Sequence, residues 1–324
     1  MKNHSRLAGM QYLVMITVWI VLGLLIAVTH LDRFLNYYSA SMLAELEFLV
    51  PVVVLLFMDR FEVMRGTRMK VIRIQTVLWI LLLTVLIMPI NYYLNAVSQL
   101  LVPNAVNANV AYFNALTGNN MWGNPLWLNL LYMAVLPALI EEYIFRAVLF
   151  QGFRSCGLLK TALLTALMFG LAHGNLNQFM YAFAMGLFFA YLVEAAGSVY
   201  ASMLLHTLIN SFTVFIFYIE MHLPENVTSA MIEAENSVSS EQHLGLAFWI
   251  IGAVIAGACV VLAVIVLRRI ALSAGREVVY KEARKGRDRL KGKEGSVFSV
   301  QLLIGLLIPV VYMAIVMIVS IVRK

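Results

Sequence analysis

Residues 137–146 read Pro-Ala-Leu-Ile-Glu-Glu-Tyr-Ile-Phe-Arg and place two adjacent carboxylates and one guanidinium in an otherwise apolar stretch. Upstream of this motif, residues 74–140 contain no Asp, Glu, Lys or Arg. Ionisable side chains at membrane depth are costly unless they are paired or hydrated, so they usually serve a function. Glu141, Glu142 and Arg146 are therefore the first candidates for chemistry.

The composition of the whole chain indicates a polytopic membrane protein. Of its 324 residues 62% are hydrophobic and 12% are charged, whereas soluble chains are roughly 45–50% apolar and about 25% charged. Apolar stretches of about 20 residues recur and predict an all-α fold with about nine transmembrane helices. We place them near residues 8–29, 39–58, 74–97, 126–151, 160–176, 178–196, 199–219, 245–267 and 297–321.

The distribution of Lys and Arg predicts the orientation of the chain. The N-terminus, the loop 59–73 and the segment 268–296 are rich in cations, which predicts that all three are cytoplasmic in a multi-pass protein of the cell membrane. The acidic segment 220–243 is then external. The terminal pair Arg323-Lys324 falls on the outer side, which leaves the direction of the last helix open. Because the cations lie in loops between spans, we expect no nucleic-acid partner.

Three regions follow from this path. Residues 1–125 hold the first three helices and the basic loop 59–73, and residues 126–219 hold the core helices, which carry the Glu141-Glu142 motif. Residues 220–324 hold the external acidic loop, the eighth helix, the basic segment 268–296 and the C-terminal helix. The segment 268–296 either lies on the inner leaflet, attracted by anionic lipid, or is an ordinary cytoplasmic loop.

Helical spacing separates the roles of the two glutamates. Residues four apart share a helix face, so Glu142 is expected to pair with Arg146. Glu141 is rotated by about 100° and is expected to face a cavity. Two further motifs obey the same spacing, Phe169 with His173 and His206 with Asn210. The distance of each polar group from the end of its helix predicts that the three helices place these groups at a similar depth in the bilayer.

A carboxylate, two imidazoles and a carboxamide suit the hydrolysis of an amide bond. Glu141 could deprotonate a water, and Asn210 could donate hydrogen bonds to the oxyanion. His173 and His206 could orient that water, or could hold a divalent metal such as zinc together with Glu141. The residues permit either a metal or none.

The ordered motifs Glu-Glu-x-x-x-Arg at 141–146, Phe-x-x-x-His at 169–173 and His-x-x-x-Asn at 206–210 resemble the CPBP family of intramembrane proteases. That family includes the type II CAAX-prenyl endopeptidases and the bacteriocin-processing or self-immunity (Abi) proteins. The resemblance covers about residues 126–215, and Ala147 departs from the glycine that many members have there.

This resemblance implies an intramembrane endopeptidase with Glu141, His173, His206 and Asn210 as catalytic residues and with Glu142 and Arg146 as structural support. It implies a peptide or protein substrate, prenylated or not, in contact with membrane lipid.

Two other classes of function stay open. One is a non-catalytic immunity or scaffold protein of the same fold. The other is an ion-coupled transporter, for which an inverted repeat with interrupted helices would be typical. Among the other acids, Glu45 and Glu47 are expected to face the protein interior or the outer interface. Glu194, near a helix end, is expected to reach water by snorkelling.

Overall fold

The computed structural model describes residues 4–58, 68–102, 124–224, 226–227, 229, 242–285 and 298–322. Every regular secondary-structure element within these ranges is a helix. Before the core the helices are α1 (His4–Thr29), η1 (Leu31–Phe34), α2 (Tyr37–Met58) and α4 (Ile74–Leu101). One interrupted run follows, made of α6 (Leu126–Leu130), η3 (Leu131–Val135), α7 (Leu136–Glu142), η4 (Tyr143–Leu149), α8 (Phe150–Phe153) and η5 (Arg154–Cys156). The remaining helices are α9 (Leu158–Ala172), α10 (Leu176–Ala196), α11 (Val199–His222), α13 (Gln242–Ser273), α14 (Glu277–Arg284) and α15 (Val300–Val322).

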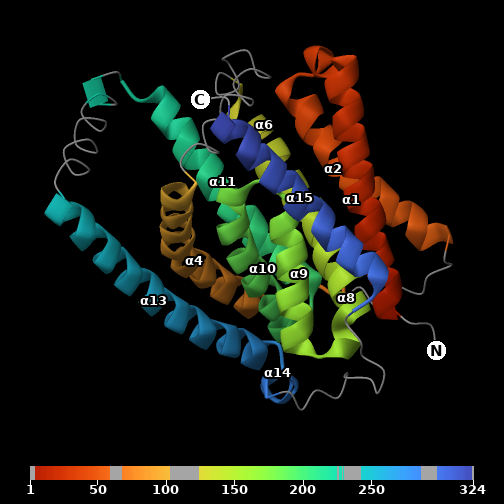
Figure 1. Cartoon of the computed structure of the whole chain (residues 1–324). Coiled ribbons are helices and arrows are strands. Elements are labelled where there is room, and N and C mark those ends of the chain that lie inside the picture. Colours follow the sequence, from red (N-terminus) through yellow and green to blue (C-terminus); the bar gives the residue numbers. More distant parts are fainter. Residues whose placement is uncertain are drawn as a thin grey trace.

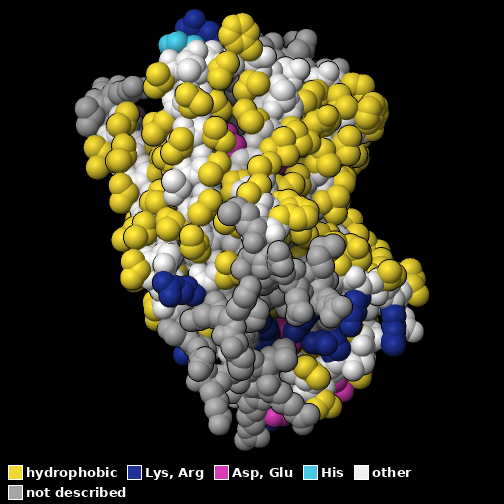
Figure 2. All heavy atoms as spheres, turned by 90° about the vertical axis from the view of Figure 1, so that its right-hand side faces the viewer, with side chains coloured by type: hydrophobic (Ala, Val, Ile, Leu, Met, Phe, Trp, Pro, Cys, Tyr) yellow, Lys and Arg dark blue, Asp and Glu magenta, His cyan; other side chains and the backbone are white. Residues whose placement is uncertain are grey.

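The all-α polytopic membrane fold predicted from composition is confirmed. In the described ranges seven helices are long and apolar enough to cross a membrane, namely α1, α2, α4, α10, α11, α13 and α15. The other two predicted spans correspond to α9, which has 15 residues, and to the interrupted run from α6 to η5. Figure 2 shows a broad hydrophobic band, with Lys and Arg gathered mostly toward the lower end.

The core helices lie side by side at the centre of the molecule (Figure 1). Helix α10 packs against α9, α4 and α11, and α11 packs against η3 and α7. On one side α13 runs along α4, and on the other α1 contacts α2 and α15. Segments far apart in the sequence therefore surround α10.

The fifth predicted span ends earlier than expected. We placed it at 160–176, but α9 stops at Ala172, and Gly174 follows with a φ of +62°. This left-handed conformation is accessible to glycine without strain and breaks the helix. The Asn175 side chain then accepts a hydrogen bond from the Asn177 backbone N–H and caps α10. Asn177 therefore belongs to α10.

The helix that carries Glu141 and Glu142 is irregular on both sides of them. Segments η3 and η4 are π-helical, and π-bulges often occur at functional sites. Pro137 has no backbone N–H to donate and stands just after η3, so it disturbs the regular α-helical ladder there. The sequence pattern predicted one helix, and the structure keeps that path with a wider turn after Glu142.

Glu194 does not snorkel as expected, because its side chain is fully buried. Its carboxylate contacts three guanidinium groups, with distances of 2.9 Å to Arg68, 3.0 Å to Arg154 and 3.2 Å to Arg276. Arg68 precedes α4, Arg154 begins η5, and Arg276 precedes α14. Arg276 also donates from Nε to the Glu194 backbone carbonyl at 3.0 Å. One buried acid thus ties three segments to the end of α10.

Close packing of α10 on α9 leads to a testable prediction at Gly186. A Cβ at this position would lie 2.8 Å from the Ala166 Cα and 3.3 Å from Arg146 Nη2. Because the first contact is with backbone, the helices would have to separate. We expect Gly186→Ala to lower the free energy of unfolding by about 1–3 kcal/mol, measured by thermal unfolding in detergent. Gly257→Ala, whose added Cβ meets nothing within 4 Å, is the matched control. Equal melting temperatures for the two variants would contradict the tight contact.

Several predicted segments fall partly or wholly outside the described residues. These include the loop residues 59–67, residues 103–123, most of the acidic segment 220–243, residues 286–297 of the basic segment, and Arg323-Lys324. The three-region division and the cytoplasmic placement of the N-terminus stay predictions.

Candidate active site

The expected ion pair between Glu142 and Arg146 lies in the centre of the protein. Arg146 Nη1 is 3.0 Å from Glu142 Oε1, and both side chains are fully buried. Arg146 also donates from Nη2 to the Gly186 carbonyl at 3.3 Å. Its guanidinium carbon lies 4.4 Å from the ring centroid of Phe169 and 5.0 Å from that of Phe189. The cation is thus fixed by a carboxylate and two aromatic rings.

His206 lies between the two glutamates. Its Nδ1 is 3.3 Å from Glu142 Oε1, and its Nε2 is 3.8 Å from Glu141 Oε2. Its ring stacks on Phe189 with centroids 4.8 Å apart. The Glu142 carboxylate is ionised in its pair with Arg146, so its oxygens can only accept hydrogen bonds. The Nδ1–H of His206 therefore donates the hydrogen bond to Glu142. In the neutral ring the Nε2 lone pair then points toward Glu141.

His173 joins the same aromatic cluster from the end of α9. Its Nδ1 lies 2.8 Å from the Phe169 carbonyl oxygen, which can only accept, so Nδ1 carries the hydrogen and Nε2 is an acceptor. The rings of His173 and His206 both stand edge-on to Phe169, with centroids at 4.9 Å and 5.9 Å. The two imidazoles also interact electrostatically. Phe169 therefore supports both histidines.

The remaining predicted residues differ in how closely they meet. The Glu141 side chain is 20% exposed, and its Oε2 has no hydrogen-bond partner within the described part of the chain. Asn210 is half-buried on α11, one turn after His206, and the spacing of four residues puts it on the same face. The structure thus brings Glu141, Glu142, Arg146 and His206 into direct contact, with His173 alongside them and Asn210 one turn away.

Sequence reasoning missed Glu45 as a neighbour of this site. Glu45 lies on α2, which packs against α7, and its carboxylate interacts electrostatically with that of Glu141. In the described residues Glu45 Oε2, like Glu141 Oε2, is buried without a hydrogen-bond partner. The available signal was an acid inside an apolar helix. The sequence does not show how α2 and α7 align against each other, so it could not predict that the two carboxylates are neighbours.

The side chains of the site do not converge on a three-ligand metal position in the described residues. A catalytic zinc site needs three protein ligands at about 2.0–2.3 Å from a common point. Glu141 Oε2 and His206 Nε2, 3.8 Å apart, could share one ion. Over the ranges that the structure describes, no group of three His, Cys, Asp or Glu side chains is arranged to hold it. The residues as placed do not fit a three-ligand site, and we derive no step through a metal.

Comparison with known proteins supports the resemblance of the motifs. Residues 123–212 match the family model described as type II CAAX prenyl endopeptidase Rce1-like. This range contains Glu141, His173, His206 and Asn210. No curated protein and no solved structure matches the chain. Over these residues the core of this multi-pass membrane protein is similar to the CAAX intramembrane endopeptidases.

Proposed function

We propose that the protein hydrolyses a peptide bond near the C-terminus of a prenylated protein or peptide, with a water activated by Glu141. The observation that carries this proposal is the 3.8 Å gap between Glu141 Oε2 and His206 Nε2. Both atoms are acceptors that face each other in a buried site, and one water can donate a hydrogen bond to each of them. The family match supports the choice of a CAAX-type substrate.

The proposed reaction uses only side chains of this chain. Glu141 takes one proton from the water while the water oxygen bonds to the scissile carbonyl carbon. Asn210 donates an amide hydrogen to the oxyanion, and His206 and His173 keep the water in line. Glu141 then delivers its proton to the leaving nitrogen as the carbon–nitrogen bond breaks. The products are a shortened chain with a new carboxylate and a released C-terminal peptide with a free amine.

Glu142 and Arg146 act as positioning residues in this scheme. The chain of contacts runs from Arg146 Nη1 to Glu142 Oε1 and from that oxygen to His206 Nδ1. A carboxylate that accepts from one imidazole nitrogen fixes the ring orientation and the tautomer. The buried pair therefore directs the Nε2 lone pair of His206 at the water.

A direct test uses the purified full-length protein in lipid nanodiscs. Two peptides of identical sequence, one farnesylated on the CAAX cysteine and one not, are incubated with it, and the released C-terminal fragment is identified by mass spectrometry. We expect cleavage of the farnesylated peptide after the modified cysteine. A non-catalytic immunity or scaffold protein of the same fold would release no fragment from either peptide, and that result would overturn the proposal.

A double variant separates the positioning role from a role in stability. Replacing Glu142 with Leu and Arg146 with Met together removes both buried charges, and such paired replacement is often nearly neutral for folding. His206 then loses the acceptor on Nδ1. We expect peptide turnover to fall about 10–100-fold while the melting temperature changes little. Unchanged turnover in a folded double variant would show that Glu142 does not orient His206.

A further inference from the structure

A cavity lies away from the candidate active site, between α4, α10, α13 and α14. Its volume is about 510 Å³, within the roughly 300–1,000 Å³ range of ligand pockets. Most of its lining is apolar, with Leu187, Phe188 and Val260 among the wall residues. Polar lining groups include Tyr191, Tyr280 and Arg284.

The cavity and the catalytic residues use different faces of α10. Phe189 stacks on His206, and the Gly186 carbonyl accepts from Arg146, so these residues face the site. The cavity is lined instead by Leu187 and Tyr191 of the same helix. At about 100° per residue the two sets lie on roughly opposite sides of α10. A molecule in this cavity is therefore separated from Glu141 by the helix itself.

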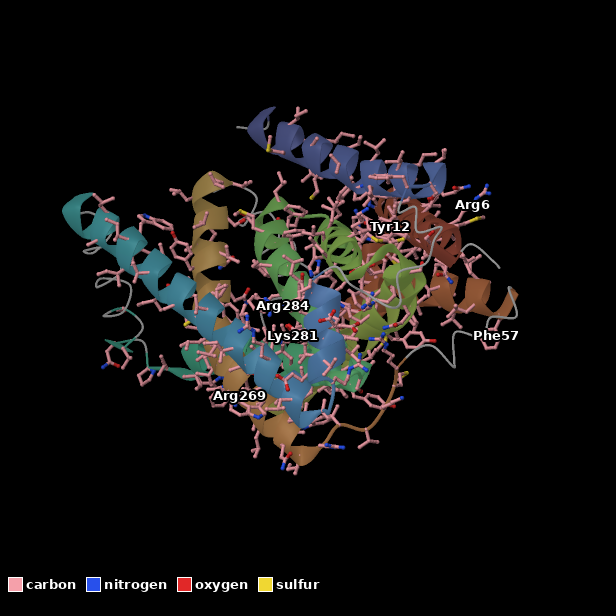
Figure 3. The ribbon with its side chains drawn as sticks, turned by 90° about the horizontal axis from the view of Figure 1, so that it is seen from below. Arg6, Tyr12, Phe57, Arg269, Lys281 and Arg284 are labelled. Atoms are coloured by element: carbon pink, nitrogen blue, oxygen red, sulfur yellow. The ribbon has the colours of Figure 1, made fainter. Side chains whose placement is uncertain are left out.

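Cations gather at the end of the cavity where α13 meets α14. Arg284 lines the cavity, and its guanidinium carbon lies 5.7 Å from the Tyr280 ring centroid. Arg268 and Arg284 both act electrostatically on the Tyr280 phenol. Figure 3, seen from below, shows Arg269, Lys281 and Arg284 at this end of the molecule. Helix α14 also carries Glu277 and Glu282, but neither lines the cavity. The nearby acid Glu194 is engaged by its three arginines, so the charge that faces this end of the cavity favours an anion.

Tyr280 adds a neutral hydrogen-bond donor to the same end. Burial raises the pKa of its phenol to about 12, so the hydroxyl stays protonated at physiological pH. A phosphate group that approached Arg284 could then accept from the phenol as well.

From this juxtaposition of an apolar cavity and a cationic end, we propose that the cavity binds one anionic glycerophospholipid. An acyl chain fills the space between α4, α10 and α13, and the phosphate contacts Arg284. Charge complementarity supports an anionic headgroup, and the apolar walls among membrane-spanning helices support a lipid chain. This site is independent of the proposed peptidase reaction.

Native mass spectrometry of the delipidated full-length protein in detergent tests this proposal. The probes are dioleoyl phosphatidylglycerol and dioleoyl phosphatidylcholine, titrated separately. We expect one phosphatidylglycerol per chain, bound at least about tenfold more tightly than phosphatidylcholine, because both lipids carry a phosphate but the choline ammonium cancels the net charge that the cationic end attracts. Equal binding of the two lipids by the wild type would overturn the proposal.

Two glycines of α13 provide matched variants. Gly257 lines the cavity, Gly245 is not among its lining residues, and an added Cβ meets nothing within 4 Å at either position. Gly257→Leu should fill the cavity and abolish the tight phosphatidylglycerol complex, whereas Gly245→Leu should keep it. Equal lipid binding by these two variants would also contradict the proposal.

The exposed Arg284 keeps the test valid even if Gly257→Leu does not fold. Arg284→Gln should lower the affinity for phosphatidylglycerol to the level of the affinity for phosphatidylcholine. An unchanged preference would exclude Arg284 as the headgroup contact. Inorganic phosphate at millimolar concentration should not displace the lipid. If it does, a free phosphate ion occupies the cationic end as well as the lipid does, and the proposal of a lipid-specific site fails.

Discussion

Glu141→Gln is expected to reduce turnover of a farnesylated CAAX peptide by about 10²–10⁴-fold, the usual contribution of a general base. The exchange keeps the shape of the side chain and removes its ability to take a proton from water. Because Glu141 Oε2 accepts no hydrogen bond in the described structure, the exchange removes no hydrogen bond of that atom. The loss should therefore appear in kcat, with the melting temperature close to that of the wild type.

A control with the same chemistry is available on α2. Glu47 is largely buried and stands two residues from Glu45, about 200° around the helix. Glu47→Gln should keep peptide turnover within a few-fold of the wild type. If Glu141→Gln cleaves as fast as Glu47→Gln, then Glu141 is not the water activator and the proposed reaction fails at its first step.

The part of the site that was predictable from sequence depends on spacing within single helices. The ion pair of Glu142 with Arg146 follows from a separation of four residues, and the 3.0 Å contact has this geometry. The contact of His206 with both glutamates depends on how α11 packs against α7. The order of the motifs made that approach plausible, but only the packing gives its distances.

Residues whose partners lie on other helices could not be assigned those partners from the sequence. Glu45 was expected at an interface or in the general interior, and the packing of α2 on α7 sets it beside Glu141. Glu194 was expected to reach water because it stands near a helix end. Its partners Arg68 and Arg276 come from segments counted as topology signals, 126 and 82 residues away. Helix periodicity carries no information on such distant pairs.

Glu194→Gln is expected to destabilise the fold by about 3–5 kcal/mol, the usual cost of breaking a buried ion pair. The effect should lie at the upper end of this range because three guanidinium groups lose one shared counter-charge and then repel one another. Arg154 is 5% exposed, whereas Arg68 and Arg276 are 18% and 26% exposed. Water can therefore solvate the unpaired charges of Arg68 and Arg276 better than that of Arg154. Thermal unfolding in detergent should show the loss as a lower melting temperature.

Glu277→Gln is the matched control for this variant, because Glu277 is exposed in the first turn of α14. There the lost interaction with the helix dipole costs at most about 1 kcal/mol. High salt offers a second readout, since screening weakens repulsion among partly exposed arginines. The melting temperature of Glu194→Gln should therefore rise with salt more than that of the wild type. Equal melting temperatures for Glu194→Gln and Glu277→Gln would mean that Glu194 does not hold the ends of α4, η5 and α14 against α10.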